Sequence, residues 1–200
     1  MKTCVLIGKP NVGKTLLLLN LAKFLGNKTI KLHFMDADGN SMAKVYDIEV
    51  AKRYLCGRQP YSTMGLQWIR MNAGCQYIEL VDTTGLIGDA VEPTTLRKAM
   101  AQTISFIKNA SLLLHIIDAT SLPSQPLPVD DIDVVLSHIF GGNDNYVMLI
   151  NKIDLVDRAD DILGKGAKAF NVNSDKIICV SALNKAGFKG IIDYINAQKG

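Results

Sequence analysis

The chain has 200 residues, a size that suits one domain with a substantial core, and we expect a single domain spanning 1–200. Its formal net charge of +3, without any run of basic residues, gives no indication of a nucleic-acid surface. No apolar stretch is long enough to span a membrane, and the four cysteines lack C-x-x-C spacing, which favours reduced thiols in a cytoplasmic protein.

The chain begins with a strand, a glycine-rich loop and a helix. Apolar residues predict a strand over 3–8, and a leucine-rich run predicts a helix over 14–25. The loop between them has the pattern G-x-x-x-x-G-K-[ST], which binds phosphate in this strand–loop–helix context, in Gly8, Lys9, Pro10, Asn11, Val12, Gly13, Lys14 and Thr15. The glycines let backbone N–H groups turn toward phosphate oxygens, and the helix start adds its positive end. A chance glycine-rich turn is the alternative, which the flanking strand and helix disfavour.

Two side chains of this loop can act on a bound nucleotide. The amine of Lys14 can reach the β- and γ-phosphates, and the hydroxyl of Thr15 can ligate Mg²⁺. The loop therefore predicts binding of a nucleoside triphosphate.

The next segment, residues 29–55, predicts a hairpin and a short helix. Strands are expected over 29–35 and 42–47, with a turn between them, and a helix over 48–55. Asp36, Asp38 and Asn40 would also suit Ca²⁺, but Gly39 is misplaced for an EF-hand loop and no glutamate closes it. We favour the hairpin. As an insertion, it is a candidate for partner recognition.

Strands and helices alternate in the rest of the chain. The expected elements are a loop 56–64, strands 65–71 and 75–81, a mobile loop 82–94, a helix 95–108, a strand 111–118, a loop 119–130, a helix 131–140, a strand 146–151, a helix 155–170, a strand 176–180 and a helix 187–197. This alternation favours an α/β fold with a mostly parallel sheet and helices on both faces. Nucleotide then binds at the carboxyl ends of the strands. His115, within an apolar strand, is interpreted as a core histidine with its hydrogen bonds satisfied.

The strand 146–151 runs into Asn151-Lys152-Ile153-Asp154, which resembles the base-reading N-K-x-D motif of the GTPase superfamily. The Asp154 carboxylate can accept hydrogen bonds from the N1–H and 2-amino groups of guanine, a pair that adenine lacks, and such a site rejects analogues strongly. Asn151 can brace the loop and approach the base edge, while the stem of Lys152 can cover the ring. A surface helix start could carry the same letters, but the upstream phosphate loop favours guanine.

The resemblance implies roles for three further segments. Asp82, at the end of strand 75–81, would hold Mg²⁺ through a water molecule, and the Gly85 N–H would contact the γ-phosphate. A threonine that closes over Mg²⁺ and the γ-phosphate is expected in the preceding loop, with Thr63 favoured and Ser62 in reserve; Thr63 could equally lead into strand 65–71. The backbone N–H that meets the guanine oxygen would come from Ser181, Ala182 and Leu183.

With these residues, the chain resembles the small G domains of the translation-factor-related GTPases, in the branch that contains the Era, Obg, MnmE and FeoB proteins. The match runs from Val5 to about Ile195 and implies a three-layer P-loop NTPase fold, with the hairpin inserted before the first switch. The loop form G-x-P-N-V-G-K-T and the string 82–87 point to this branch, and the string 112–118 is similar to the Obg proteins in particular. Relatives carry extra partner-specifying domains, which are not expected within these residues.

Two residues bear on the mechanism that the resemblance implies. Leu86 stands where Ras-like proteins place a water-orienting glutamine, and leucine cannot hydrogen-bond water, so other groups would position the nucleophile. In several relatives the asparagine at the place of Asn11 helps to hold K⁺, which offsets charge in the transition state. A loop-bracing amide is the alternative for Asn11. We expect slow GTP hydrolysis that K⁺ accelerates.

The predicted function is that of a GTPase switch, which binds GTP·Mg²⁺, releases GDP and phosphate, and reorders residues 56–64 and 82–94. The residues expected to act in catalysis are Lys14, Thr63, Gly85 and Asn11, and those expected at Mg²⁺ are Thr15, Thr63 and Asp82. The alternative is a guanine-nucleotide-dependent binding module with negligible turnover, which shares every binding residue. A kinase would not explain the N-K-x-D and D-x-x-G sequences together. The expected partners are guanine nucleotide and an unidentified protein or ribonucleoprotein effector. A second copy of the chain, in a GTP-dependent homodimer, is a further possible partner.

Overall fold

The computed structural model describes residues 1–36, 39–56, 66–83, 103–122, 128, 131–157 and 159–198. Its strands are β1 (Lys2–Ile7), β2 (Thr29–Met35), β3 (Ser41–Asp47), β4 (Leu66–Ala73), β5 (Gln76–Asp82), β6 (Leu112–Asp118), β7 (Tyr146–Asn151) and β8 (Ile177–Cys179). Its α-helices are α1 (Lys14–Phe24), α2 (Ile48–Leu55), α4 (Ile132–Phe140), α5 (Ala159–Phe170) and α6 (Phe188–Ala197), and residues 103–108 are also helical. Short 3₁₀ turns are η1 (Ala119–Ser121), η2 (Ile153–Leu155) and η3 (Ser174–Lys176).

The strands form one sheet in the order β3-β2-β4-β5-β1-β6-β7-β8. Strand β1 lies at its centre and pairs in parallel with β5 and β6, and the parallel pairing continues to β7 and β8. Strands β2, β3 and β4 add antiparallel pairs on the other side. The predicted mostly parallel sheet is confirmed, and the carboxyl ends of its five parallel strands meet at one edge.

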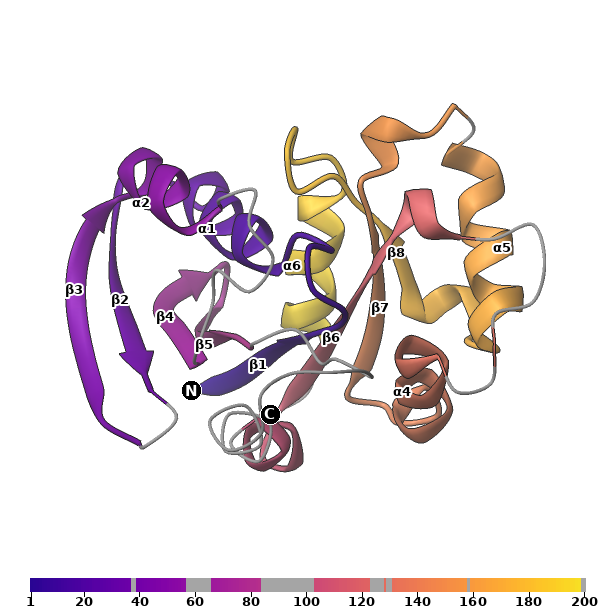
Figure 1. The fold of residues 1–200 in the computed structure, drawn as a ribbon, viewed down its shortest axis with the longest axis horizontal. Coiled ribbons are helices and arrows are strands. Elements are labelled where there is room, and N and C mark those ends of the chain that lie inside the picture. The colour runs from indigo at the N-terminus through magenta and orange to yellow at the C-terminus, as the bar shows by residue number, and fades with distance from the viewer. Residues whose placement is uncertain are drawn as a thin grey trace.

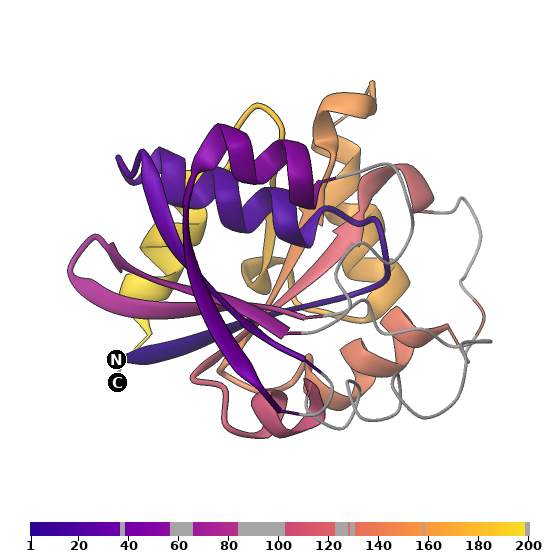
Figure 2. The ribbon, with the colours of Figure 1, turned by 60° about the vertical axis from the view of Figure 1, so that its left-hand side comes forward.

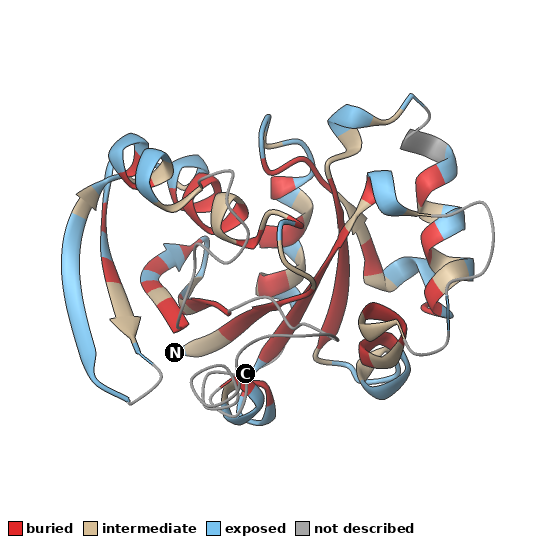
Figure 3. Ribbon diagram, in the orientation of Figure 1, coloured by how far each residue is buried: buried red, intermediate tan, exposed pale blue. Residues whose placement is uncertain are grey.

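Helices cover both faces of this sheet, which gives the three predicted layers (Figures 1 and 2). Helices α1, α2 and α6 pack on one face, and α4 and α5 pack on the other. The central strands lie between two apolar clusters, and β1, β6 and β7 are buried over most of their length (Figure 3). In β1, Cys4 and Leu6 enter the first cluster while Val5 and Ile7 enter the second, because successive side chains of a strand point to opposite faces.

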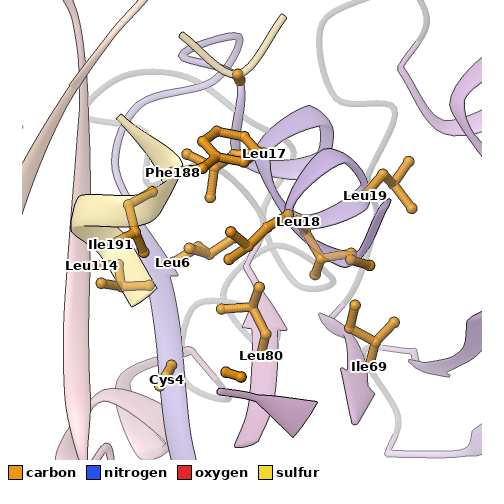
Figure 4. Close-up of a cluster of buried hydrophobic side chains, with 14 of the residues drawn as sticks. Cys4, Leu6, Leu17, Leu18, Leu19, Ile69, Leu80, Leu114, Phe188 and Ile191 are labelled. Atoms are coloured by element: carbon orange, nitrogen blue, oxygen red, sulfur yellow. The ribbon is translucent and has the colours of Figure 1, made fainter. Parts of the chain in front are cut away.

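Helix α1 is the best-buried helix of the first cluster. Its leucine run packs against the sheet and against the neighbouring helix α6, with Leu17 beside Phe188 of α6 and Leu18 near Leu6 (Figure 4). Phe188 also meets Phe24 edge-on, with ring centroids 5.7 Å apart. Because apolar residues surround the helix on several sides, α1 cannot shift without disturbing the core.

The predicted hairpin is confirmed, and it forms the edge of the central sheet. Strands β2 and β3 pair in register from Thr29 with Asp47 to Met35 with Ser41, and β2 then pairs with β4. Asp47 caps α2 by accepting hydrogen bonds from the next helical amides, and an ion pair of 2.6 Å between Lys23 and Glu49 joins α1 to α2. The segment is thus integral to the fold.

One predicted helix starts too early. The expected helix 155–170 begins at Ala159, and the residues before it form the 3₁₀ turn η2. The Ile153 amide donates to the carbonyl of Val180, which keeps this turn close to the loop after β8 and delays the helix. Of the expected loops 56–64 and 82–94 and the helix 95–108, only residues 56, 82–83 and 103–108 lie within the described residues.

Candidate functional site

The phosphate loop, residues 8–15, joins the central strand β1 to α1, and two of its glycines are required by their surroundings. Gly8 has φ 136°, and a Cβ there would lie 2.3 Å from the carbonyl oxygen of Ile116. Gly13 has φ 101°, stands at the N-terminus of α1, and a Cβ there would lie 2.5 Å from Nδ2 of Asn151. Both backbone conformation and space therefore demand glycine.

Lys14 is buried inside this loop with an exposed fraction of 6%. Its Nζ donates hydrogen bonds to the carbonyls of Gly8 at 3.1 Å and Lys9 at 2.7 Å. Burial lowers the pKa of this amine to about 8, although the charges of Asp82 and Asp133 act in the opposite direction. Among the described residues its hydrogen-bond acceptors are these two carbonyls, which the ammonium can exchange for charged phosphate oxygens.

Asp82, Thr15 and Gln67 meet where β5 ends beside the phosphate loop. One carboxylate oxygen of Asp82, Oδ2, accepts hydrogen bonds from the Thr15 hydroxyl and from the Gln67 side chain, both at 2.6 Å. The other, Oδ1, is buried and has no hydrogen-bond partner among the described residues. Burial raises the pKa of Asp82 against the opposing effects of Lys14, Thr15 and Gln67.

This arrangement fits a divalent cation. A hydroxyl and a carboxylate are the hard oxygen ligands that Mg²⁺ prefers, and a cation or its water would satisfy the unpaired oxygen of Asp82. Gln67 was not among the predicted site residues. Its only signal in the sequence is a polar side chain between apolar neighbours of a strand, and its position opposite Asp82 comes from the β4–β5 register.

Asn151, at the end of β7, connects the phosphate loop to the loop after β8. Its Nδ2 donates to the carbonyl of Val12 at 2.7 Å, and its Oδ1 accepts the Ala182 amide at 2.8 Å. The side chain is buried, so both hydrogen bonds are shielded from water. One side chain thereby fixes the distance between two loops that are far apart in the sequence.

The neighbouring residues Lys152 and Asp154 are each held by a partner. Lys152 takes the left-handed conformation with φ 66°, and its Nζ lies 2.5 Å from Oδ2 of Asp118 at the end of β6. Burial opposes the charge on Asp118, but hydrogen bonds from Lys152 and Thr120 outweigh it and hold the pKa of that carboxyl below its usual range. Asp154 accepts a hydrogen bond of 2.5 Å from the Ser181 hydroxyl through one oxygen, and its other oxygen has no hydrogen-bond partner among the residues that the structure describes.

A second polar network lies behind the phosphate loop, on the side of α4. Lys9 pairs with Asp131 at 2.6 Å and with Asp133 at 3.5 Å. His115 is fully buried and lies between Asp133, at 3.1 Å from Nε2, and the Tyr146 hydroxyl, at 2.7 Å from Nδ1. Burial opposes the charge of Lys9, yet the two aspartates outweigh it and raise the pKa of the amine. His115 is a core histidine with partners, as predicted, whereas Asp131 and Asp133 were not predicted to lie at the loop.

Most of the predicted site residues lie along the carboxyl edge of the sheet. The loops 8–15, 151–154 and 181–183 meet there, and Asp82 lies beside β1, with Leu6 as its register partner. Asn11 is exposed at the tip of the phosphate loop, with φ 62°. The predicted residues Thr63 and Gly85 lie outside the described residues, as do Ser62 and Leu86.

The sequence is similar to GTPases, both in a family model and in individual proteins. The family model described as "50S ribosome-binding GTPase" matches residues 3–152. GTPase Obg of Natranaerobius thermophilus is 26% identical over 204 residues, covering 95% of this chain and 38% of that protein. The tRNA modification GTPase MnmE of Pseudothermotoga lettingae is 28% identical over 203 residues, covering 98% of this chain and 37% of that protein. The chain thus spans less than two-fifths of the length of these two relatives.

Similar folds occur among solved structures. One is Era in a complex with MgGDPNP and nucleotides 1506–1542 of 16S ribosomal RNA, with a TM-score of 0.71 at 20% identity. The alignment covers all of this chain and 57% of the Era chain. Another is the FeoB G-domain from Methanococcus jannaschii, with a TM-score of 0.54 at 18% identity. That alignment covers 98% of this chain and 97% of the FeoB chain. At these identities the likeness bears on the fold. In the part of the chain that the structure describes, no helix is long and apolar enough to cross a membrane.

Proposed function

Because the chain belongs to the family described as 50S ribosome-binding GTPases, and is a G domain of the Era/Obg/MnmE/FeoB-like branch, we propose that it binds GTP with Mg²⁺ and acts as a nucleotide-dependent switch. In this proposal it hydrolyses GTP to GDP and phosphate. The observation that carries the proposal is the double hydrogen bond of Asn151, which sets the phosphate loop beside the loop that would read the base.

The described residues supply the nucleotide contacts of this proposal. Lys14 would leave the carbonyls of Gly8 and Lys9 for the β- and γ-phosphates. Thr15 and Asp82 would hold Mg²⁺, which when bound offsets the charge that develops on the phosphate oxygens. The free oxygen of Asp154 would accept from the guanine edge, because Ser181 occupies only the other.

The remaining roles in hydrolysis are proposed from the sequence. Thr63 and the Gly85 N–H would close over the γ-phosphate, and Leu86 would leave the attacking water to other groups. Intrinsic turnover is therefore proposed to be slow. Phosphate release from the purified chain with Mg²⁺ tests this, with Lys14→Met, which removes the ammonium contact to the β- and γ-phosphates, as the control.

The alternative function is a guanine-nucleotide-dependent binding module with negligible turnover. It is favoured by Leu86, which cannot orient water. Tight GDP binding without phosphate release above that of Lys14→Met would establish this alternative and contradict the hydrolase.

Stimulation by K⁺ is proposed for Asn11. What supports this proposal is that Asn11 lies in the phosphate loop and that the residue is exposed, so its side chain is open to a cation. Because the backbone there is left-handed, Asn11→Gly removes the side chain without backbone strain and is a cleaner test than alanine. Hydrolysis should be faster in K⁺ than in Na⁺ for the unchanged chain and equal in both for Asn11→Gly. Equal rates in the unchanged chain, at one ionic strength, would remove K⁺ from the proposal.

We also propose that the protein works in the cytoplasm and that a protein or ribonucleoprotein effector reads its nucleotide state. The solved Era structure contains a ribosomal RNA segment, and the relatives in the family are described by ribosome and tRNA functions. Pull-downs from lysate with the chain loaded with a non-hydrolysable GTP analogue or with GDP test this. A GTP-dependent homodimer is checked by size-exclusion chromatography in the same two states.

A further inference from the structure

The peptide groups on both sides of Ala182 are held by two buried asparagines. On one side, Oδ1 of Asn151 accepts a hydrogen bond from the Ala182 N–H. From the other, Asn20 of α1 donates its Nδ2 to the Ala182 carbonyl at 2.6 Å. Asn20 is 3% exposed. Successive peptide planes of the loop after β8 are thereby fixed, one through its N–H and the next through its carbonyl.

The contact with Asn20 determines where the next amide points. The Ala182–Leu183 peptide is trans, and in a trans peptide the carbonyl and the N–H point in opposite directions. Since the carbonyl faces α1, the Leu183 N–H faces away from α1. The Leu183 side chain is 67% exposed, so this part of the loop borders solvent rather than core. Asp154 is attached to the same loop through Ser181.

From this arrangement we infer that Asn20 is a positioning residue for guanine recognition. It holds the Ala182–Leu183 peptide so that the Leu183 N–H meets the oxygen at position 6 of the base, while Asp154 reads the N1–H and the 2-amino group. The inference rests on the proposed function, because it concerns the same nucleotide site. It adds a residue of α1, outside every sequence motif, to the groups that select guanine.

The energetic balance at Asn20 supports a role in the loop rather than in the core. Its amide must donate to Ala182, because a carbonyl oxygen can only accept. The side chain's own oxygen, Oδ1, is then left buried without a hydrogen-bond partner among the described residues. Its helix neighbours Leu19 and Leu21 are fully buried in the apolar cluster. Half of the amide thus loses its hydration without compensation, so core packing alone favours an apolar residue at this position.

Asn20 also places the base loop and the phosphate groups on one rigid element. Lys14 and Thr15 lie in the first turn of α1, and Asn20 follows Lys14 by six residues, about 9 Å along the axis. Because α1 is packed on several sides, the helix sets the separation between the phosphate contacts and the Leu183 amide.

The test compares three guanine-like ligands in Asn20→Leu, which has a similar size and no donor. The ligands are GDP, 6-thio-GDP, in which only the oxygen at position 6 becomes a weakly accepting sulfur, and IDP, which lacks only the 2-amino group. We expect GDP affinity to fall about three- to tenfold, as for one misplaced hydrogen bond, and 6-thio-GDP affinity to change less. The GDP/6-thio-GDP ratio therefore drops toward one, while the GDP/IDP ratio, which depends on Asp154, stays unchanged. Isothermal titration calorimetry gives all three constants.

The matched control is Leu19→Ala, which weakens the packing of the same helix but leaves the contact between Asn20 and Ala182 in place. It should leave both ligand ratios at their original values. If Asn20→Leu does not fold by circular dichroism, Asn20→Ala carries the same comparison. Equal losses for GDP and 6-thio-GDP in the Asn20 variant would overturn the inference. An unchanged chain that binds GDP no better than ADP contradicts the proposed function instead, so the two failures are distinguishable.

Discussion

At the scale of single residues, the hydrogen bonding of Asp154 determines which base the proposed site would select. One of its oxygens accepts from the Ser181 hydroxyl at 2.5 Å, so an amide at this position could keep that contact through its own oxygen. The amide nitrogen would then face the base and donate where guanine also donates. Xanthine, which carries a carbonyl in place of the 2-amino group, would instead find a partner.

We predict that Asp154→Asn lowers GDP affinity at least about a hundredfold, since two hydrogen bonds to a charged group are lost, and raises XDP affinity. Competition with a fluorescent nucleotide measures both. Asp157→Asn, which changes an exposed carboxylate three residues away, serves as the control and should leave both affinities unaltered. Loss of GDP binding without any gain for XDP would contradict the assignment.

A second prediction concerns the buried chain formed by Tyr146, His115 and Asp133. Substitution His115→Phe keeps an aromatic ring but leaves the tyrosine hydroxyl and one aspartate oxygen buried without their partner. The free energy of unfolding should fall by about 2–4 kcal/mol, measured by urea denaturation.

The control for this prediction is Asp193→Ala. It breaks an ion pair with Lys189 in which both side chains are mostly exposed, and it should cost less than about 0.5 kcal/mol. A loss of similar size in both variants would show that the buried network does not stabilise the fold.

Sequence motifs predicted those site residues whose role depends on their neighbours along the chain. Asn151 and Asp154 fall in one such motif, and the loop 8–15 in another. Gln67, Asn20 and the acids of α4 were not predicted, because each reaches the site through pairing or packing between segments that lie far apart in the sequence. For Gln67, Asn20 and Asp133 the signal is a polar residue between apolar neighbours, whereas Asp131 follows another aspartate, and the partner of each is visible only in the fold.

At the scale of elements, the hairpin and α2 are part of the core rather than an appendage. Ile48 and Ala51 of α2 are buried in the cluster around α1, and Leu32 of β2 joins them. Deleting residues 29–55 would therefore expose the edge of β4 and unfold the domain. A partner-binding role of this segment has to be tested on the exposed side chains of β3, such as Met42 and Val45.

We predict that Ile48→Ala lowers the free energy of unfolding by about 2–4 kcal/mol, because a fully buried side chain leaves a cavity. Tyr54→Ala on the same helix should change it by less than about 0.5 kcal/mol, since that side chain is 75% exposed. Chemical denaturation of both variants gives the comparison. A small effect at Ile48 would mean that α2 does not pack on α1 as the structure has it.

The order and type of the elements followed from apolar periodicity, and the boundary that failed has a tertiary cause. Helix α2 was predicted residue for residue, and the structure adds that Asp47 caps its first turn. The start of α5 was placed too early, because a contact between Ile153 and Val180, which follows β8, holds residues 153–155 in a 3₁₀ turn.

At the scale of the whole molecule, the site joins segments from both ends of the chain. The loops after β1, β7 and β8 converge on it, together with Asp82 at the end of β5, so a nucleotide would tie together residues from 8 to 183. A ligand that binds only the folded state raises its stability by mass action.

GDP with Mg²⁺, at about a hundred times its Kd, should stabilise the fold by about 2.7 kcal/mol and raise Tm by about 5–10 °C. Removing Mg²⁺ with EDTA should reduce this shift, and Thr15→Ala should make the shift insensitive to EDTA. Differential scanning fluorimetry measures each case, with ADP as the control that produces no shift. An equal shift with ADP would contradict guanine selection.

The sequence predicted the fold class because alternating strands and helices leave few arrangements for a parallel sheet. It did not predict the strand order on the antiparallel side, where the hairpin joins β4 and lengthens the sheet. That pairing depends on side-chain packing between β2 and β4, and no local pattern of residues encodes it.

The close approach of Gly8 to the Ile116 carbonyl limits which variants of this protein can survive selection. Any side chain at that position would have to push β6 away from β1, so a saturation library displayed on GDP resin would return glycine alone. Position 9 would also accept arginine, which can pair with the same two aspartates. At the tip, residue 11 is exposed and has room for a side chain, with a left-handed backbone that favours asparagine, aspartate and glycine. Residue 8, at the base of the loop, therefore has to stay glycine. Residue 11, at the tip, can change, and related proteins can evolve different activators at that position.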